Sequence, residues 1–164
     1  MTEAHNIKVK NRLGELMRQP GGRSVIEALR GAEKRIEKNH DMFLGALDRS
    51  LARMESAAGA LDATPNAKAA DEIYQAANDI IAMAGLVGFQ SLDELAHGLC
   101  DLIDVLRAEG VWSDQAIKVH VDSALLLRGL RPEDEAARER VLDGLRKVWA
   151  RFGVESRAGG TAAT

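Results

Sequence analysis

The chain has 164 residues, of which 46% are hydrophobic, 29% charged and only 4% aromatic, with a formal net charge of −3. This length suits one ordinary domain, and the composition excludes a disordered or fibrous protein. The slight acidity argues against nucleic acid or an anionic membrane surface as the main partner. Abundant alanine and leucine, with few β-branched residues and three prolines, favour an all-α fold.

Cysteine usage and the N-terminal residues narrow the class further. Cys100 is the single cysteine, which excludes an intramolecular disulfide and a cysteine-based zinc site. The first ten residues lack the apolar core of a signal peptide, and no apolar run approaches the roughly 18 residues of a membrane span. We therefore expect a cytoplasmic protein without a metal or other cofactor.

The first predicted elements are an arm and a long helix. Residues 1–22 carry charge and a weak apolar pattern and end in Pro-Gly-Gly, which predicts an N-terminal arm with at most one short helix. Ser24 and Glu27 then have the spacing of a capping box that opens a helix. The apolar positions of this helix recur every three or four residues, at Val25, Leu29, Ala32, Ile36, Phe43, Leu47, Leu51 and Met54.

Two further helices form a predicted hairpin. Thr64 and Pro65 suit the N-cap and first position of a helix whose apolar side carries Ile73, Ala77, Ile80, Ala84 and Val87. Residues 88–90 make a short turn. Ser91 and Glu94 have the spacing of a second capping box, and Gly110 ends the helix that follows.

The C-terminal third predicts two more helices. Ser113 caps a helix that runs to about Arg128, and Gly129 stops it. Pro132 and the acidic residues after it start a fifth helix, and residues 153–164 are expected to form a disordered tail. Short connections between amphipathic helices predict an up-and-down four-helix bundle within residues 23–152, with an additional C-terminal helix.

One face of the helix around residue 78 is a candidate docking surface. At about 100° per residue, Asn78 lies roughly 140° from the centre of the apolar stripe, and Ala82 and Gly85 also face solvent. Ile81 lies about 80° from that centre, at the edge of the core. Such a flat, weakly apolar surface suits docking of another protein, whereas the simpler interpretation is a solvated helix face with Ile81 packed into the rim.

Residues 77–89 (ANDIIAMAGLVGF) and 95–102 (LAHGLCDL) resemble the histidine phosphotransfer (HPt) domain family, most closely its stand-alone alphaproteobacterial members. In that family a helix bears His-x-x-Lys-Gly, then a small residue and a terminal glycine. Here Asp79 and Ile80 match an Asp-Ile pair of the family, Ala84 the small residue and Gly88 the terminal glycine. The resemblance implies an HPt bundle in two-component phosphorelay or chemotaxis-type signalling, whose partners are response-regulator receiver domains or histidine kinases.

The departures from the family fall on the chemistry. Asn78 occupies the position of the phosphorylated histidine, Ile81 that of the lysine and Ala82 that of the first glycine. A carboxamide has no nitrogen as nucleophilic as that of an imidazole, so Asn78 cannot accept a phosphoryl group. The resemblance therefore implies a degenerate HPt domain that is not an enzyme and that binds its partners through Asn78, Ile81, Ala82 and Gly85.

Two alternative functions remain open at this stage. The first is phosphotransfer through another histidine, His97 or His120. The second is a structural bundle that self-associates as a homodimer through its long first helix.

The other histidines and the cysteine have structural interpretations. His40 and His120 lie within about 40° of their apolar stripes, which predicts partial burial and a hydrogen bond. Glu37–His40 and Glu94–His97 have the spacing of di-iron ligands, but His97 is predicted on an outer face, so we expect no such site. Cys100 is expected to pack against a neighbouring helix.

Overall fold

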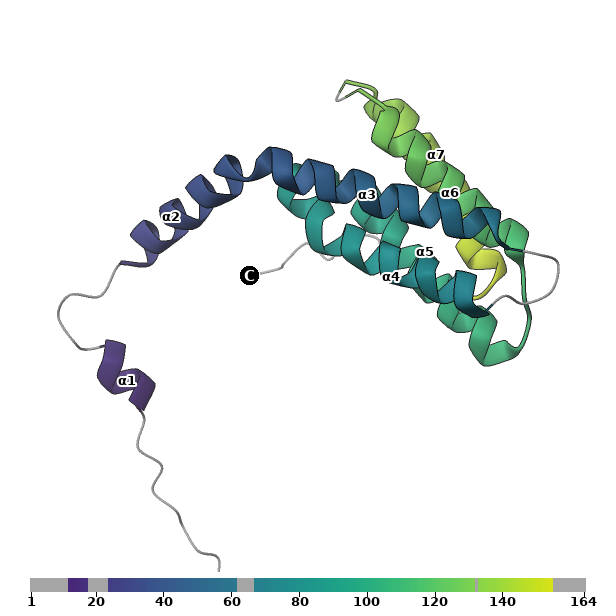
Figure 1. Ribbon diagram of the computed structural model, residues 1–164, viewed down its shortest axis with the longest axis horizontal. Helices are drawn as coiled ribbons and strands as arrows, with labels where there is room; N and C mark the ends of the chain where they lie inside the picture. Colours follow the sequence, from purple (N-terminus) through teal and green to yellow (C-terminus); the bar gives the residue numbers. More distant parts are fainter. Residues whose placement is uncertain (1–11, 18–23, 62–66, 132, 155–164) are drawn as a thin grey trace, which may run out of the picture. The chain divides into compact units, whose positions relative to one another are not determined.

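The computed structural model of the chain describes residues 12–17, 24–61, 67–131 and 133–154 (Figure 1). The chain divides into two compact units, Met1–Lys38 and Asn39–Thr164. Within the described ranges every regular element is a helix, which confirms the all-α prediction. Each of these helices is too short or too polar to cross a membrane.

The first unit contains α1 (Arg12–Met17) and α2 (Val25–Lys38). The predicted capping box is present at the start of α2. The Glu27 backbone N–H donates to Ser24 Oγ at 3.1 Å, and the Ser24 backbone N–H donates to Glu27 Oε2 at 2.9 Å. The hydrogen bond from the Ser24 backbone lowers the pKa of the Glu27 carboxyl. Residues 1–11 and 18–23 of the predicted arm lie outside the described part of the chain.

The predicted long first helix is wrong, because the helical backbone is interrupted at Asn39. One helix ends at Lys38, and α3 (His40–Gly59) begins one residue later. Asn39 has φ −105° and ψ 9°, outside the helical region, although its carbonyl still accepts the Phe43 N–H at 3.0 Å. Asparagine has a low helix propensity because its side chain competes for backbone hydrogen bonds, which fits its place at the interruption.

The predicted hairpin is formed by α4 (Ala67–Ala84), the 3₁₀ turn η1 (Gly85–Val87) and α5 (Gln90–Glu109). Gly88, with φ 82°, turns the chain, and Gly110, with φ 66°, ends α5 as predicted. Thr64 and Pro65 lie outside the described residues.

The second predicted capping box is wrong. Helix α5 begins at Gln90, so Ser91 lies inside it, and the N-cap residue Phe89 makes no side-chain capping bond. Glu94 instead accepts a hydrogen bond from Arg146 Nε on α7 at 2.9 Å. The Glu94 carboxylate, which the local pattern assigned to a capping box with Ser91, therefore forms an ion pair with a distant helix instead.

The last helices are α6 (Asp114–Gly129) and α7 (Glu135–Arg151). Ser113 caps α6 as predicted, because its hydroxyl accepts the Ala116 N–H at 3.2 Å. Asp134, one of the acidic residues after Pro132, is the N-cap of α7. After α7, Val154 is buried and donates its N–H to the Trp149 carbonyl at 3.0 Å, so the expected tail begins no earlier than residue 155, outside the described part.

Helices α3, α4, α5 and α6 contact one another in a closed ring, and α7 packs against α5 and α6 (Figure 1). Hydrogen bonds between helices show the relative direction of two pairs of neighbouring helices. Asp71 and Tyr74 on α4 bind Arg107 and Asp104 on α5, so these helices are antiparallel. Asp48 in the middle of α3 binds Arg128 near the end of α6, and the Leu61 carbonyl just after α3 binds Lys118 near the start of α6, so these helices are antiparallel as well.

Trp149 fastens α7 to the rest of the unit. Its side chain is only 2% exposed. The indole ring lies against Gly98 of α5, where any Cβ would overlap it, and its N–H donates to His120 of α6 at 2.6 Å. One tryptophan therefore connects α7 to both neighbouring helices.

Candidate functional site

The outward face of α4 has the orientation that its periodicity predicts. Ile73, Ala77, Ile80 and Ala84 are completely buried against the neighbouring helices. On the opposite side, Asn78, Ala82 and Gly85 are exposed. A methyl group added to Gly85 would contact nothing within 4 Å, so the surface around it is open. The face thus carries small, uncharged side chains along its centre.

Asn78 is bound to its own helix. Its Nδ2 donates a hydrogen bond to the Tyr74 carbonyl one turn earlier, at 3.1 Å. This bond leaves the amide oxygen, which is an acceptor, free to meet a donor on a partner. The residue offers a hydrogen-bonding contact and no nucleophile.

Ile81 differs from its three neighbours on this face. Its side chain is half-buried and packs against the core. The interpretation of this residue as part of the rim is therefore confirmed. Ile81 therefore packs mainly against the core, and only part of its side chain reaches solvent.

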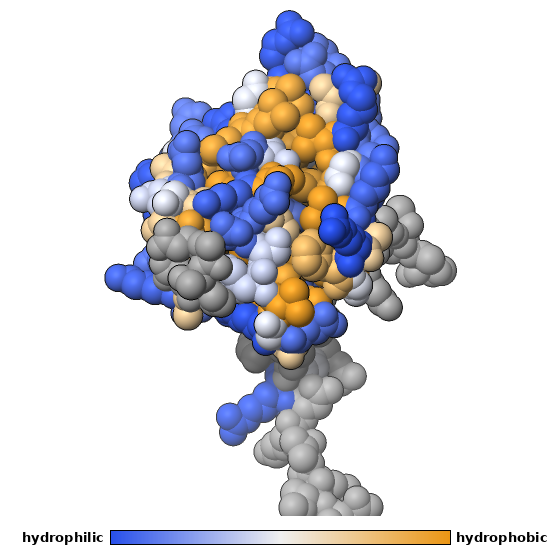
Figure 2. All heavy atoms as spheres, turned by 90° about the vertical axis from the view of Figure 1, so that its right-hand side faces the viewer, coloured by the Kyte–Doolittle hydropathy of each residue, from blue (hydrophilic) through white to orange (hydrophobic). Residues whose placement is uncertain are grey.

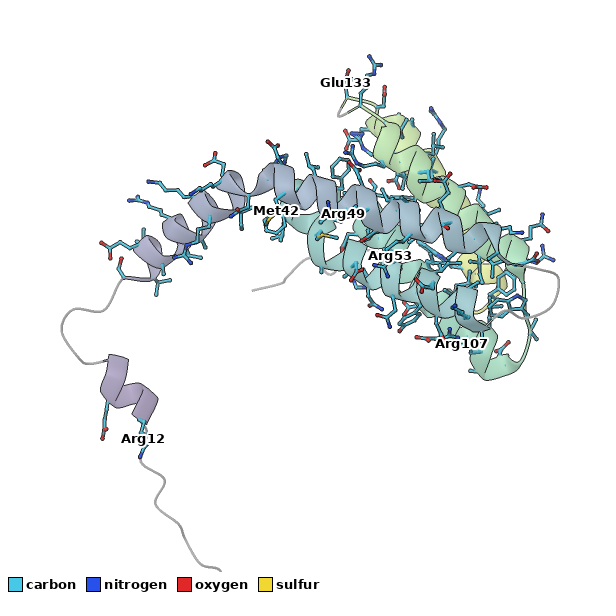
Figure 3. The ribbon with its side chains drawn as sticks, viewed as in Figure 1. Arg12, Met42, Arg49, Arg53, Arg107 and Glu133 are labelled. Atoms are coloured by element: carbon cyan, nitrogen blue, oxygen red, sulfur yellow. The ribbon has the colours of Figure 1, made fainter. Side chains whose placement is uncertain are left out.

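Ion pairs border the face on both sides (Figure 3). Toward α3, Arg53 Nη1 lies 2.7 Å from Asp79 Oδ2. Toward α5, Arg107 Nη2 lies 2.6 Å from Asp71 Oδ1, and the same guanidinium lies over the Tyr74 ring, 5.7 Å from its centroid. These pairs hold α4 between its neighbours and balance the charge along both edges.

His97 of α5 lies at the same level as Ile81. Tyr74 binds Asp104 and Asp71 binds Arg107, which sets the register between the antiparallel helices α4 and α5. In this register Ile81 of α4 lies level with His97 of α5. The His97 side chain is 38% exposed, and its Nε2 lies 3.8 Å from Asp93. The sequence predicts the exposure of His97, but its level relative to Ile81 follows only from the pairing between the helices.

His120 is hydrogen-bonded, as predicted, but it is fully rather than partly buried. Its Nδ1–H donates to the Ala116 carbonyl at 2.7 Å, and its Nε2 accepts the indole N–H of Trp149. Burial lowers the pKa of this imidazole to about 4, so the ring is neutral near pH 7. Because both nitrogens are bound and no surface is exposed, His120 cannot meet a phosphorylated partner. The expected burial of His40 is wrong, since His40 is exposed beside Asp41.

Cys100 is buried, as predicted, and burial raises the pKa of its thiol to about 12. Such a thiol is not a nucleophile near pH 7. No group of three or more potential metal-ligating side chains comes together among the described residues. In the candidate di-iron pair Glu94–His97, the carboxylate is bound to Arg146.

The described part of the chain is thus an all-helical protein with an exposed face of small, neutral side chains on α4. The chain matches no protein-family model, no curated protein and no solved structure.

Proposed function

We propose that the chain is a degenerate HPt protein, an up-and-down bundle that binds receiver or histidine-kinase domains without relaying phosphate through Asn78. The observation that carries the proposal is the exposed row formed by Asn78 and Ala82 on α4 and Gly85 at the start of η1. It coincides with the segment whose sequence resembles the phosphoacceptor helix of that family.

The mechanism we propose is occupancy. Small side chains along the centre of the face let another protein approach closely, and the paired charges of Arg53 and Arg107 give it a polar border. A receiver domain covered by this face is withheld from other phosphoryl donors and acceptors. The protein would then compete with active phosphotransfer proteins or hold a regulator in place.

Replacing Ala82 with arginine tests the docking face. Ala82 is exposed, so the variant is expected to fold like the wild type, while its long charged side chain blocks close approach. Binding to the cognate receiver domain should weaken about tenfold or more, measured by isothermal titration calorimetry. Ala52→Arg, at an exposed alanine of α3, is the matched control and should bind normally. Equal binding by both variants would exclude the α4 face.

Restoring the family residues tests the lost chemistry. The double variant Asn78→His, Ile81→Lys is expected to accept phosphate from a phosphorylated receiver, because an exposed imidazole and a cation one turn away replace the amide and the aliphatic chain. Acid-labile phosphate on the intact protein is the measurement. The wild type should stay unlabelled, and a folded double variant that binds receivers but takes no label would refute the proposed ancestry of the site.

Phosphotransfer through His97 is a second candidate, favoured by the level of its exposed imidazole beside Ile81. Asp93 next to this ring disfavours an incoming phosphoryl group, which is why we place the candidate second. Label on the wild type that is lost in His97→Gln would establish it.

A further inference from the structure

Helices α6 and α7 form an apolar groove that the proposed docking face does not use. Val119 of α6 and Val148 of α7 line one hollow of about 280 Å³ together with Phe152. Two helical turns further along the antiparallel pair, Leu126 lies level with Val141, and Leu130 then lies level with Ala137. Val119 is 40% and Leu126 is 52% exposed.

The middle of this groove is open. Between its two ends Ser123 has a small side chain and Gly144 has none, and a Cβ added to Gly144 would contact nothing within 4 Å. Figure 2 shows hydrophobic surface between hydrophilic borders on the face of the molecule that is on the right in Figure 1, where α6 and α7 are drawn. The surface has the form into which an amphipathic helix packs.

One border of the groove is cationic. Arg140, Lys147 and Arg151 of α7 are exposed and make no ion pair within the described ranges. Arg151 lines the hollow beside Val148, and Lys147 lies one turn before it on the same face. A helix that occupies the groove is therefore expected to carry carboxylates one turn apart along one flank.

Helix α2 has the complementary features. In its apolar stripe Val25 is 75% and Leu29 58% exposed, Ile36 is half-buried, and none of the residues of α2 is classed as buried. A helix of this length is marginal in water without a packing partner. Glu33 and Glu37 are exposed, follow Ala32 and Ile36 by one residue each and so share one flank of the stripe.

We propose that α2 of a second copy of this chain lies in the α6–α7 groove, parallel to α7, with Glu33 beside Lys147 and Glu37 beside Arg151. In this register Ile36 meets the hollow of Val119 and Val148, and Leu29 meets Leu126 and Val141. Ala32 then lies over the open middle of the groove, where small side chains allow close approach. Arg30 lies on the same flank of α2 as Glu33. In this register it is level with Gly144 of α7, so it is not placed beside a positively charged side chain.

Reciprocal exchange of α2 closes the assembly at two copies, so the expected product is a symmetric dimer. This inference does not depend on the proposed docking of receiver domains, which uses α4. Analytical ultracentrifugation of the full chain over a range of concentrations is the first measurement. A monomer at all concentrations would overturn the proposal.

Two substitutions at exposed positions locate the interface. Leu29→Asp in α2 and Leu126→Asp in α6 should each give a monomer at concentrations where the wild type is dimeric, with unchanged far-ultraviolet circular dichroism. Val111→Asp, at a residue 53% exposed outside both surfaces, should leave the dimer intact. A dimer that is lost with Leu29→Asp but kept with Leu126→Asp would indicate pairing of α2 with α2 and overturn the proposal.

Charge reversal tests the register. The double variants Glu33→Lys, Glu37→Lys and Lys147→Glu, Arg151→Glu should each dimerise about tenfold more weakly, whereas one chain with all four changes should regain the wild-type association. Glu55→Lys, at an exposed residue of α3, is the control for net charge. Failure of the fourfold variant to recover would refute the pairing of these residues.

Discussion

Replacing Gly98 with alanine is expected to destabilise the protein by about 3 kcal/mol, because the added methyl group has no room. The new Cβ would overlap two carbon atoms of the Trp149 indole, which is itself buried between α5 and α6. Either the indole leaves its slot or α7 moves away from α5, and both break the bond to His120. Urea unfolding followed by circular dichroism gives the change in the free energy of unfolding.

Gly45→Ala is the matched control for this substitution. Gly45 also lies inside a helix, and its Cβ would meet only a guanidinium nitrogen of Arg49, at an ordinary 3.5 Å. This variant should be about 0.5–1 kcal/mol more stable than the wild type. Combining Gly98→Ala with Trp149→Leu should cost less than the sum of the two single changes, because the smaller side chain relieves the overlap. Additive costs would contradict the proposed clash.

Acidification should destabilise the protein through His120. Its pKa is about 4 in the folded state and near 6.5 in the unfolded chain, so the unfolded chain takes up the proton first as pH falls. The contribution of the neutral ring is complete above pH 6.5 and is lost progressively down to about pH 4, an expected total of about 3 kcal/mol. A protonated Nε2 would also face the indole N–H of Trp149, two donors against each other.

The free energy of unfolding measured by urea titration at several pH values between 4 and 7 tests this dependence. His120→Gln keeps an acceptor for the indole N–H but does not titrate, so its stability should vary less over this range than that of the wild type. His97→Gln, at a partly exposed histidine, is the control for replacement of an imidazole by an amide. A slope unchanged in His120→Gln would assign the acid sensitivity to other groups.

Local patterns predicted the features that a helix decides by itself. The capping box at Ser24 and the cap at Ser113 need only residues within one turn, and both are formed. The exposure of Asn78, Ala82 and Gly85 follows from the helical period once the buried stripe is recognised. These predictions succeeded because each partner atom lies close in the sequence.

Contacts with distant helices, present or absent, account for several features that the local patterns did not predict. Glu94 binds Arg146 rather than completing a cap with Ser91, and Trp149 is buried because Gly98 leaves a slot for its ring. His40 is exposed although it follows the apolar period, because the side chains of this part of the helix are fully buried only from Leu47 onward. The spacing of hydrophobic residues along one helix does not show which other helix, if any, packs against a given turn of it.

The amino-acid sequence by itself determined the helical class, most helix ends and the neutral face of α4, because hydrogen bonds and side-chain period within one helix set these features. Only the tertiary structure decided the burial of His120 under Trp149, the level of His97 beside Ile81, and the groove that α6 and α7 leave uncovered. Those features depend on the register between helices that are far apart in the chain. That register is set by the packing of whole side chains, which no local pattern encodes.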